Sequence, residues 1–166
     1  MIAYNTLLFH GSVIAVDGEA YLFTAKSGTG KSTHTKLWRK YFGNRAVMVN
    51  DDKPLLKVTG KGVLACGTPW AGKDHLQNNI MVPLKAVCIL ERDTVNHIEL
   101  IRKRDAWKMI LQQSYRSDQP AVLSSTIRLA EQIMDKTKLY RLGCNMSMRA
   151  VETSYNGMNT DIDYAD

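Results

Sequence analysis

The stretch from residue 25 to residue 32 has the sequence AKSGTGKS. Its spacing matches the phosphate-loop pattern GxxxxGK(S/T) except at the first position, where Ala25 replaces glycine. Glycines at positions 28 and 30 let the backbone curl so that successive N–H groups point at one anion. Lys31 can reach the outer phosphates of a nucleotide, and Ser32 can bind Mg²⁺. The alternative is a chance match in an ordinary turn between a strand and a helix. The predicted nucleotide-binding residues are Ser27, Gly28, Thr29, Gly30, Lys31, Ser32 and Thr33.

An acidic pair, Asp51-Asp52, follows the short apolar run of residues 46–49. In open α/β sheets, ligands bind outside the carboxyl ends of the strands. We therefore expect the pair to lie beside the phosphate loop, since one strand–helix–strand unit connects the two. One carboxylate there can bind Mg²⁺, and the other can accept the proton of an attacking hydroxyl. The alternative is that the pair merely forms a turn before Lys53-Pro54.

A polar loop, GTPWAGK at residues 67–73, follows another predicted strand. It could close over the phosphates, with Lys73 neutralising the charge that develops in the transition state. Trp70 could stack on a base or cover the site. The alternative is a surface turn with a half-buried tryptophan. The basic run of residues 102–104 is more typical of a solvated face.

The elements that must position these residues are a mixture of strands and helices. An Asp17-Gly18 pair between two apolar runs predicts a hairpin, because a type I′ turn requires positive φ at both central residues. The expected strands cover residues 7–16, 19–25, 46–49, 55–58, 63–66, 84–91, 98–102 and 138–142. The expected helices cover residues 31–41, 105–115, a stretch after Pro120, and a last segment capped by Ser147 and ended by Gly157. This order predicts an α/β fold with a mixed β-sheet, an N-terminal hairpin, the phosphate loop and helices packed on the sheet.

The composition is that of a globular protein. The chain has 166 residues, 45% of them hydrophobic and 23% charged, which suits one domain with its own core. We expect that domain to cover residues 1–157, followed by an acidic, mobile tail at 158–166. No apolar run approaches the ~18 residues of a membrane span, and the first ten residues lack the features of a signal peptide. The expected location is the cytoplasm, with no membrane partner.

The net charge of +6 favours anionic partners such as nucleotides, phosphorylated metabolites or acidic peptides. The lysines and arginines are scattered and not interleaved with aromatic residues, so nucleic acid is not an expected partner. The three cysteines form no CxxC pair, which predicts reduced thiols rather than a disulfide framework or a zinc site. Self-association stays open.

Three motifs together resemble the catalytic domain of the bacterial HPr kinase/phosphorylase family and, more distantly, phosphoenolpyruvate carboxykinase. They are His10-Gly11 before the hairpin, the loop of residues 27–32, and Asn50-Asp51-Asp52 at the end of the next strand. The resemblance implies that the loop binds ATP or pyrophosphate. It also implies that Asp51 is the base toward a serine hydroxyl, that Asp52 helps to hold Mg²⁺, and that His10 lies near the metal and the transferring phosphoryl group.

These observations predict an ATP- and Mg²⁺-dependent kinase that transfers the γ-phosphoryl group to a hydroxyl acceptor. The acceptor would be a serine-type hydroxyl in a protein or peptide, or a small molecule. His10 and Lys73 would assist Asp51, while Ser32 and Asp52 would hold Mg²⁺. Two alternatives stay open: a nucleotide-binding regulatory module, and a nucleoside triphosphate hydrolase that activates water.

Overall fold

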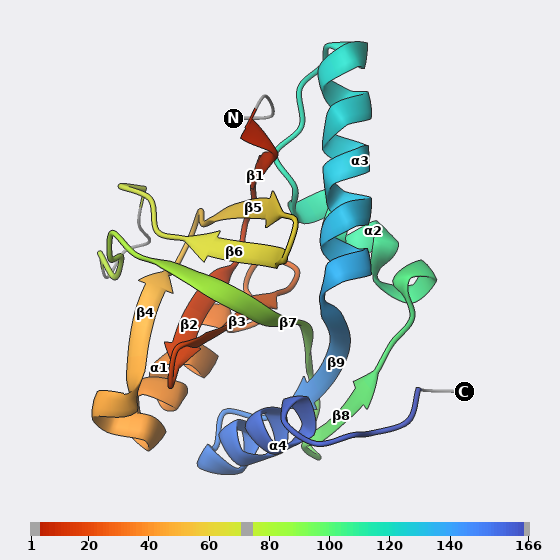
Figure 1. The fold of residues 1–166 in the computed structure, drawn as a ribbon. Helices are drawn as coiled ribbons and strands as arrows, with labels where there is room; N and C mark the ends of the chain where they lie inside the picture. Colours follow the sequence, from red (N-terminus) through yellow and green to blue (C-terminus); the bar gives the residue numbers. More distant parts are fainter. Residues whose placement is uncertain (1–3, 71–74, 165–166) are drawn as a thin grey trace.

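A computed structural model describes residues 4–70 and 75–164. Its architecture is mixed α/β, with helices on both faces of a curled sheet, and this confirms the predicted fold class (Figure 1). The strands are β1 (Thr6–Leu8), β2 (Ser12–Val16), β3 (Glu19–Thr24), β4 (Ala46–Asn50), β5 (Leu55–Thr59), β6 (Gly62–Cys66), β7 (Met81–Arg92), β8 (His97–Leu100) and β9 (Lys138–Cys144). The helices are α1 (Lys31–Phe42), α2 (Lys103–Gln113), α3 (Pro120–Lys136) and α4 (Met148–Met158), and a 3₁₀ turn at Gly43–Arg45 follows α1.

The long strand β7 connects the two parts of the sheet. The strand order is β1-β5-β6-β7-β3-β2-β4, and β9 pairs with β7 and β8. The first residues of β7, 81–83, pair antiparallel with β6. Its remaining residues lie between β3 and β9, and both of these pairings are parallel. One continuous strand thus joins the β5–β6 hairpin to the central strands that carry the phosphate loop.

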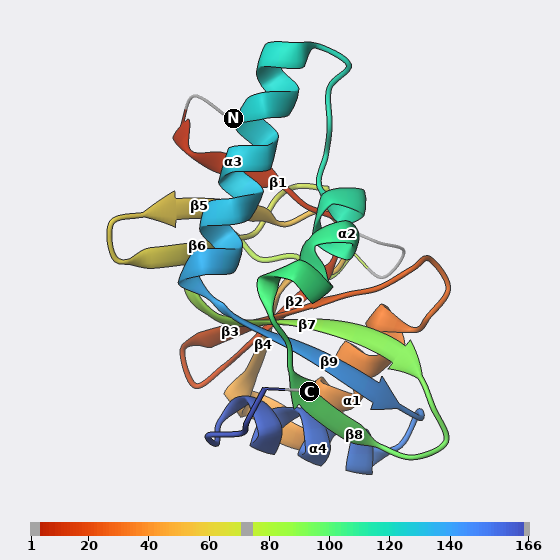
Figure 2. The same cartoon turned by 90° about the vertical axis from the view of Figure 1, so that its right-hand side faces the viewer.

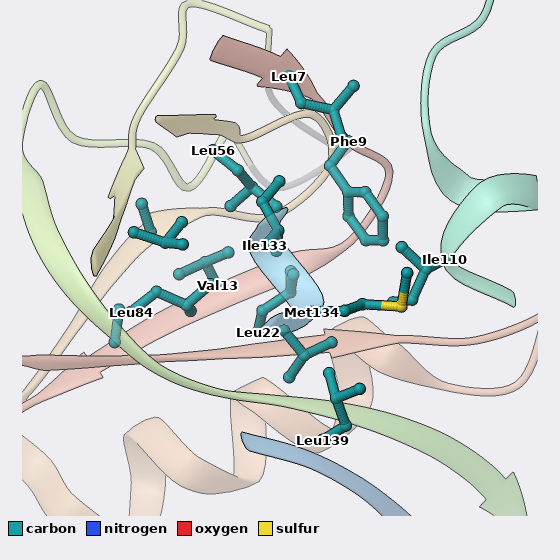
Figure 3. Close-up of a cluster of buried hydrophobic side chains, with 14 of the residues drawn as sticks. Leu7, Phe9, Val13, Leu22, Leu56, Leu84, Ile110, Ile133, Met134 and Leu139 are labelled. Atoms are coloured by element: carbon teal, nitrogen blue, oxygen red, sulfur yellow. The ribbon is translucent and has the colours of Figure 1, made fainter. Parts of the chain in front are cut away.

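Side chains of the central strands alternate between two cores. On β2, Val13 and Ala15 pack with residues of α2, α3 and the β5–β6 hairpin, whereas Ile14 and Val16 pack with residues of α1 and α4. This alternation follows from the two-residue repeat of a strand. Figure 2 shows α1 and α4 on one side of the central strands and α2 and α3 on the other. Figure 3 shows the first core, with Leu7, Phe9, Val13, Leu22, Leu56, Leu84, Ile110, Ile133, Met134 and Leu139 labelled.

The predicted hairpin forms, but its first strand is shorter than the sequence indicated. Asp17 and Gly18 have φ of 51° and 82°, and the strands pair from Val16 opposite Glu19. The predicted strand at residues 7–16 divides at His10-Gly11, and β1 pairs with β5 instead. The backbone N–H groups of these two residues donate outside the hairpin, at 2.8 Å to Gln113 and at 3.1 Å to Asp52. These two hydrogen bonds connect residues 10 and 11 to other segments, so the first strand of the hairpin begins only at Ser12.

The C-terminal elements also differ from the expectation. Helix α4 does not end at Gly157 but continues to Met158, which is buried. A Cβ at residue 157 would lie 2.3 Å from Ile98 Cγ2 of β8, so this glycine lets the helix pack closely on the strand. The mobility of the tail after residue 157 stays a prediction, as does the cytoplasmic location. Within the described ranges, no helix is both long enough and apolar enough to cross a membrane.

Candidate functional site

Three neighbouring strands bring the predicted site residues to one edge of the sheet. β2 lies between β3 and β4 and runs antiparallel to both. The amino end of β2 therefore lies beside the carboxyl ends of β3 and β4. The phosphate loop follows β3, the acidic pair follows β4, and His10-Gly11 precede β2. The loop and the pair thus meet at this edge, although β2 separates the two strands that carry them.

The phosphate loop has a conformation that its glycines permit. Gly28 and Gly30 have φ of 80° and 108°, a left-handed region that glycine enters without a steric penalty. Helix α1 begins at Lys31, so the N–H groups of its first turn lie at the loop without intrahelical partners. The Lys31 ammonium donates to the carbonyl of Ala25 at 3.5 Å. Burial lowers the pKa of Lys31, and the negative charges of Asp51 and Asp52 oppose that shift.

Asp51 is the carboxylate next to the loop hydroxyl. Ser32 Oγ donates to Asp51 Oδ1 at 3.1 Å, and Ser12 Oγ donates to the same oxygen at 2.6 Å. The residue is only 8% exposed. Ser12 Oγ also lies 3.0 Å from Thr35 Oγ1, one turn along α1 from the loop. Hydroxyl groups from β2 and α1 therefore fix a buried acid at the point where the loop meets the helix.

Asp52 faces different surroundings. Its side chain is 30% exposed, and its Oδ1 lies 3.4 Å from His10 Nε2. The other ring nitrogen, Nδ1, lies 2.8 Å from Gln113 Oε1 at the end of α2. Because an amide oxygen only accepts, Nδ1 carries the hydrogen of that bond. Gln113 therefore orients the imidazole, and Nε2 of that ring faces the more open carboxylate.

Asn50 holds the backbone of the acidic pair. It is fully buried, and its Oδ1 accepts the N–H groups of Asp52 and Lys53, each at 2.8 Å. Its Nδ2 donates to Thr68 Oγ1 and to the carbonyl of Trp70, each at 2.9 Å. The side-chain amide therefore connects the turn after β4 to the loop that begins at residue 67. This arrangement makes the acidic pair a fixed turn and not a flexible one.

The phosphate loop, the two acids and His10 line one open cavity of about 660 Å³, a size typical of small-molecule sites. The cavity also includes two residues that sequence reasoning missed, Arg92 at the end of β7 and Met146 before α4. Arg92 Nη2 donates to the carbonyl of Gly28 at 2.6 Å, so its guanidinium lies against the loop. The sequence does carry one indication of Arg92, because it is a basic residue at the end of a predicted buried strand. No sequence pattern indicates that Met146 belongs to the site. Among the described residues, the lining consists of His10, Ser27, Gly28, Gly30, Lys31, Ser32, Thr33, Asp51, Asp52, Arg92 and Met146.

Two other predicted residues, Thr29 and Trp70, are not part of this lining. Thr29 turns its hydroxyl back to the carbonyl of Lys26 at 2.7 Å. Trp70 is 51% exposed and contributes its carbonyl to Asn50. Lys73 lies outside the described residues, so its role stays a prediction. The basic run at residues 102–104 lines a different cavity.

The oxygen ligands at this edge fit Mg²⁺. Within the described part of the chain, no three His, Cys, Asp or Glu residues gather as a metal-binding group. Mg²⁺ does not require such a cage, because it commonly takes one or two carboxylates and completes its shell with water and phosphate oxygens. The Ser32 hydroxyl and the Asp51 carboxylate, 3.1 Å apart, supply hard oxygen ligands beside the phosphate loop.

Comparison with known proteins gives a likeness in structure only. No family model matches the chain, and no curated protein matches it in sequence. Among solved structures, it is similar to the HPr(Ser) kinase/phosphatase from Coxiella burnetii, with a TM-score of 0.48 and 12% sequence identity over 92% of each chain. At that identity the likeness does not match individual residues.

Proposed function

We propose that this protein is an ATP- and Mg²⁺-dependent kinase that transfers the γ-phosphoryl group to a hydroxyl acceptor. The observation that carries this proposal is that the phosphate loop and two carboxylates in unlike surroundings line one cavity. Phosphoryl transfer needs few covalent steps from the protein. Positioning and charge stabilisation account for most of the catalysis. Lys31, the loop amides and Arg92 are the groups that can bind the phosphates here.

The contacts support a division of labour between the acids that exchanges the roles expected from the sequence. Asp51 is buried and shares hydrogen bonds with Ser12 and Ser32, so it suits the binding of Mg²⁺ beside the loop hydroxyl. Asp52 is more open and has His10 beside it, so it suits contact with an incoming acceptor. We therefore assign metal binding to Asp51 with Ser32, and assign to Asp52, which has His10 beside its carboxylate, the acceptance of the hydroxyl proton.

The first test is transfer of label from γ-labelled ATP into protein, peptide and small-molecule fractions of an extract of the source cell. Wild type is compared with Asp51→Asn, with Asp52→Asn and with Asp118→Asn, which removes an exposed acid outside the site. We expect Asp52→Asn to bind ATP normally and to lose about 10²-fold or more in transfer. We expect Asp51→Asn to lose the Mg²⁺-dependent part of ATP binding, by about tenfold or more. Asp118→Asn should behave like wild type.

Each other outcome has a definite meaning. If Asp51→Asn keeps Mg²⁺-dependent binding but loses transfer, the division of roles predicted from the sequence is correct and the exchanged one is wrong. Phosphate release without any acceptor indicates a hydrolase. Tight ATP binding with neither transfer nor release indicates a regulatory module. Full transfer by both site variants rules out the kinase site proposed here.

A further inference from the structure

A second cavity, of about 730 Å³, lies away from the phosphate loop, between the start of β9, the end of α3 and the start of α2. Among the described residues, its lining contains one acid, Asp135, and an apolar floor that includes Leu100 and Leu139. Six of its residues are basic: Lys85, Arg102, Lys103, Arg104, Lys136 and Lys138. We call this surface the basic groove.

The basic groove is far from the candidate active site. Lys85, in the groove, and Arg92, at the phosphate loop, belong to the same strand and are seven residues apart. At about 3.3 Å per strand residue, the two lie roughly 23 Å apart along β7. The basic groove is therefore a separate surface from the proposed kinase site.

The start of α2 concentrates positive charge where a helix normally disfavours it. Arg102 is the N-cap residue, and Lys103 and Arg104 are the first two helical residues. The positive end of the helix dipole favours acids at these positions. Asp105 is the acid of the first turn, and no side chain of the described residues caps the helix. A local conflict of this kind is expected at functional sites, and here a negatively charged partner would relieve it.

The protein's own acidic C-terminal segment already lies along one edge of the groove. Asp161 Oδ1 lies 3.9 Å from Lys138 Nζ. Tyr164 is part of the groove lining, and the Arg102 guanidinium lies 4.9 Å from the centre of its ring. Tyr164 also forms a parallel bridge with Leu100 at the end of β8, and Figures 1 and 2 both show the segment after α4 running beside β8. An acidic segment with an aromatic side chain is therefore a ligand type that this surface accommodates.

Four of the groove's six basic side chains lie in ion pairs within the described part of the chain, and the other two remain available to a further partner. Lys103 pairs with Asp135 at 2.8 Å, and Lys85 pairs with Glu19 at 3.1 Å. Within residues 4–70 and 75–164, Arg102 and Lys136 make no ion pair. We propose that the basic groove is a docking site for an acidic polypeptide segment of a partner protein. Residues 161–164 occupy the edge of the groove until such a segment displaces them.

A polypeptide fits the groove better than a nucleic acid does. Single-stranded nucleic acid is bound by several aromatic side chains on which successive bases stack. Tyr164 is the one aromatic residue of this lining in the part of the chain that the structure describes, and the Arg102 guanidinium lies over its ring. Asp135 would also repel a phosphate backbone, whereas spaced carboxylates can avoid it. The apolar floor provides contact for aliphatic and aromatic side chains of a peptide.

The test uses the full-length protein and a fluorescein-labelled peptide with the sequence of residues 160–166, TDIDYAD. Fluorescence anisotropy is measured for wild type, Arg102→Ala, Lys136→Ala and the double variant Asp161→Asn/Tyr164→Ala. We expect the peptide to bind the double variant at least about fivefold more tightly than wild type, because its competitor is weakened. We expect each single variant to bind about tenfold more weakly. Asp51→Asn should bind as wild type does, since it lies in the other cavity.

The control is Lys61→Ala, which removes one exposed lysine from the turn between β5 and β6. Equal loss of binding in Lys61→Ala and Lys136→Ala would mean non-specific attraction and would overturn the proposal. Equal binding of the uncharged peptide TNINYAN, or no binding by any variant, would overturn it as well. Tighter binding of a twelve-residue uridine oligonucleotide, lost in the same groove variants, would reassign the groove to nucleic acid. Arg102→Ala and Lys136→Ala are scored separately, so misfolding of one leaves the other as the test.

Discussion

Two acids that are adjacent in the sequence have acquired different environments. Asp51 accepts hydrogen bonds from two hydroxyl groups and is almost completely buried. Asp52 is nearly one-third exposed and faces an imidazole. Neighbouring residues at a strand end point in different directions, so the chain can present one carboxylate to the interior of the loop and the other to solvent. Two adjacent residues therefore present carboxylates that differ in burial and in hydrogen-bond partners.

His34 is a second residue whose surroundings determine its chemistry. It lies in α1, fully buried, and its Nε2 accepts the indole N–H of Trp38 at 3.0 Å. Its Nδ1 has no hydrogen-bond partner among the described residues. Burial lowers the pKa of His34 to about 4, so the fold keeps the ring neutral.

This burial predicts a loss of stability in acid. The unfolded chain binds a proton at His34 below its ordinary pKa of about 6.5, whereas the folded chain resists protonation down to about pH 4. His34 therefore contributes fully above pH 6.5, and its contribution falls as the pH drops from 6.5 to 4, by a total on the order of 3 kcal/mol. Urea unfolding at pH 7, 5.5 and 4.5 measures this. The His34→Gln variant should lose less stability over that range, and parallel curves for the two proteins would contradict the prediction.

At the scale of elements, close contacts between helices and strands determine where each helix can lie. Helix α4 packs against α1 and against β8. It meets β8 where Gly157 faces Ile98. A glycine near a helix end usually marks the point where the helix ends. Gly157 instead lies within the last turn of α4, where the absence of a Cβ lets the helix pack against Ile98.

We predict that Gly157→Ala destabilises the protein by about 1–2 kcal/mol, despite the better helix propensity of alanine. The added Cβ would lie 2.3 Å from Ile98 Cγ2, on a β-branched side chain that has little freedom to move. Chemical denaturation measures the loss. In the Ile98→Ala background the same change should cost clearly less. Equal costs in the two backgrounds would show that the helix and the strand do not meet as described.

At the scale of the whole molecule, two cores flank one sheet, and β7 runs between them. Cys88 lies near the middle of β7 and packs in the core of α1 and α4, as does Cys144. Cys66, at the end of β6, is half-buried, and all three thiols are free, as the sequence predicted. Burial raises the pKa of each of these thiols, most strongly that of Cys88.

We predict that the native protein reacts with Ellman's reagent at no more than one thiol in the fast phase, at pH 8. Only thiolates react, and Cys88 and Cys144 become accessible only when the sheet opens. Their reaction should be at least about a hundredfold slower than in 6 M guanidinium chloride, where all three should react quickly. Cys66→Ser should abolish the fast phase. Rapid reaction of two thiols in the native protein would contradict this packing.

The parts of the fold predicted best from the sequence are those fixed by local chemistry. The Asp17-Gly18 turn, the start of α1 after the phosphate loop and the two strands β5 and β6 each depend on a few adjacent residues. The division of residues 7–16 and the true end of α4 were not predicted. Both depend on contacts with distant segments, through the backbone of Gln113 and the side chain of Ile98.

The sequence by itself determined the phosphate loop, because its glycines, lysine and serine must be adjacent to act together. It also indicated the acidic pair beside it, because strand, helix and strand follow one another along the chain. Only the tertiary structure decided which acid meets Ser32, brought Ser12, Arg92 and Met146 to the same site, and assembled the basic groove. These residues come from elements separated by dozens of positions. Their proximity follows from strand order and from packing on both faces of the sheet, which no local pattern encodes.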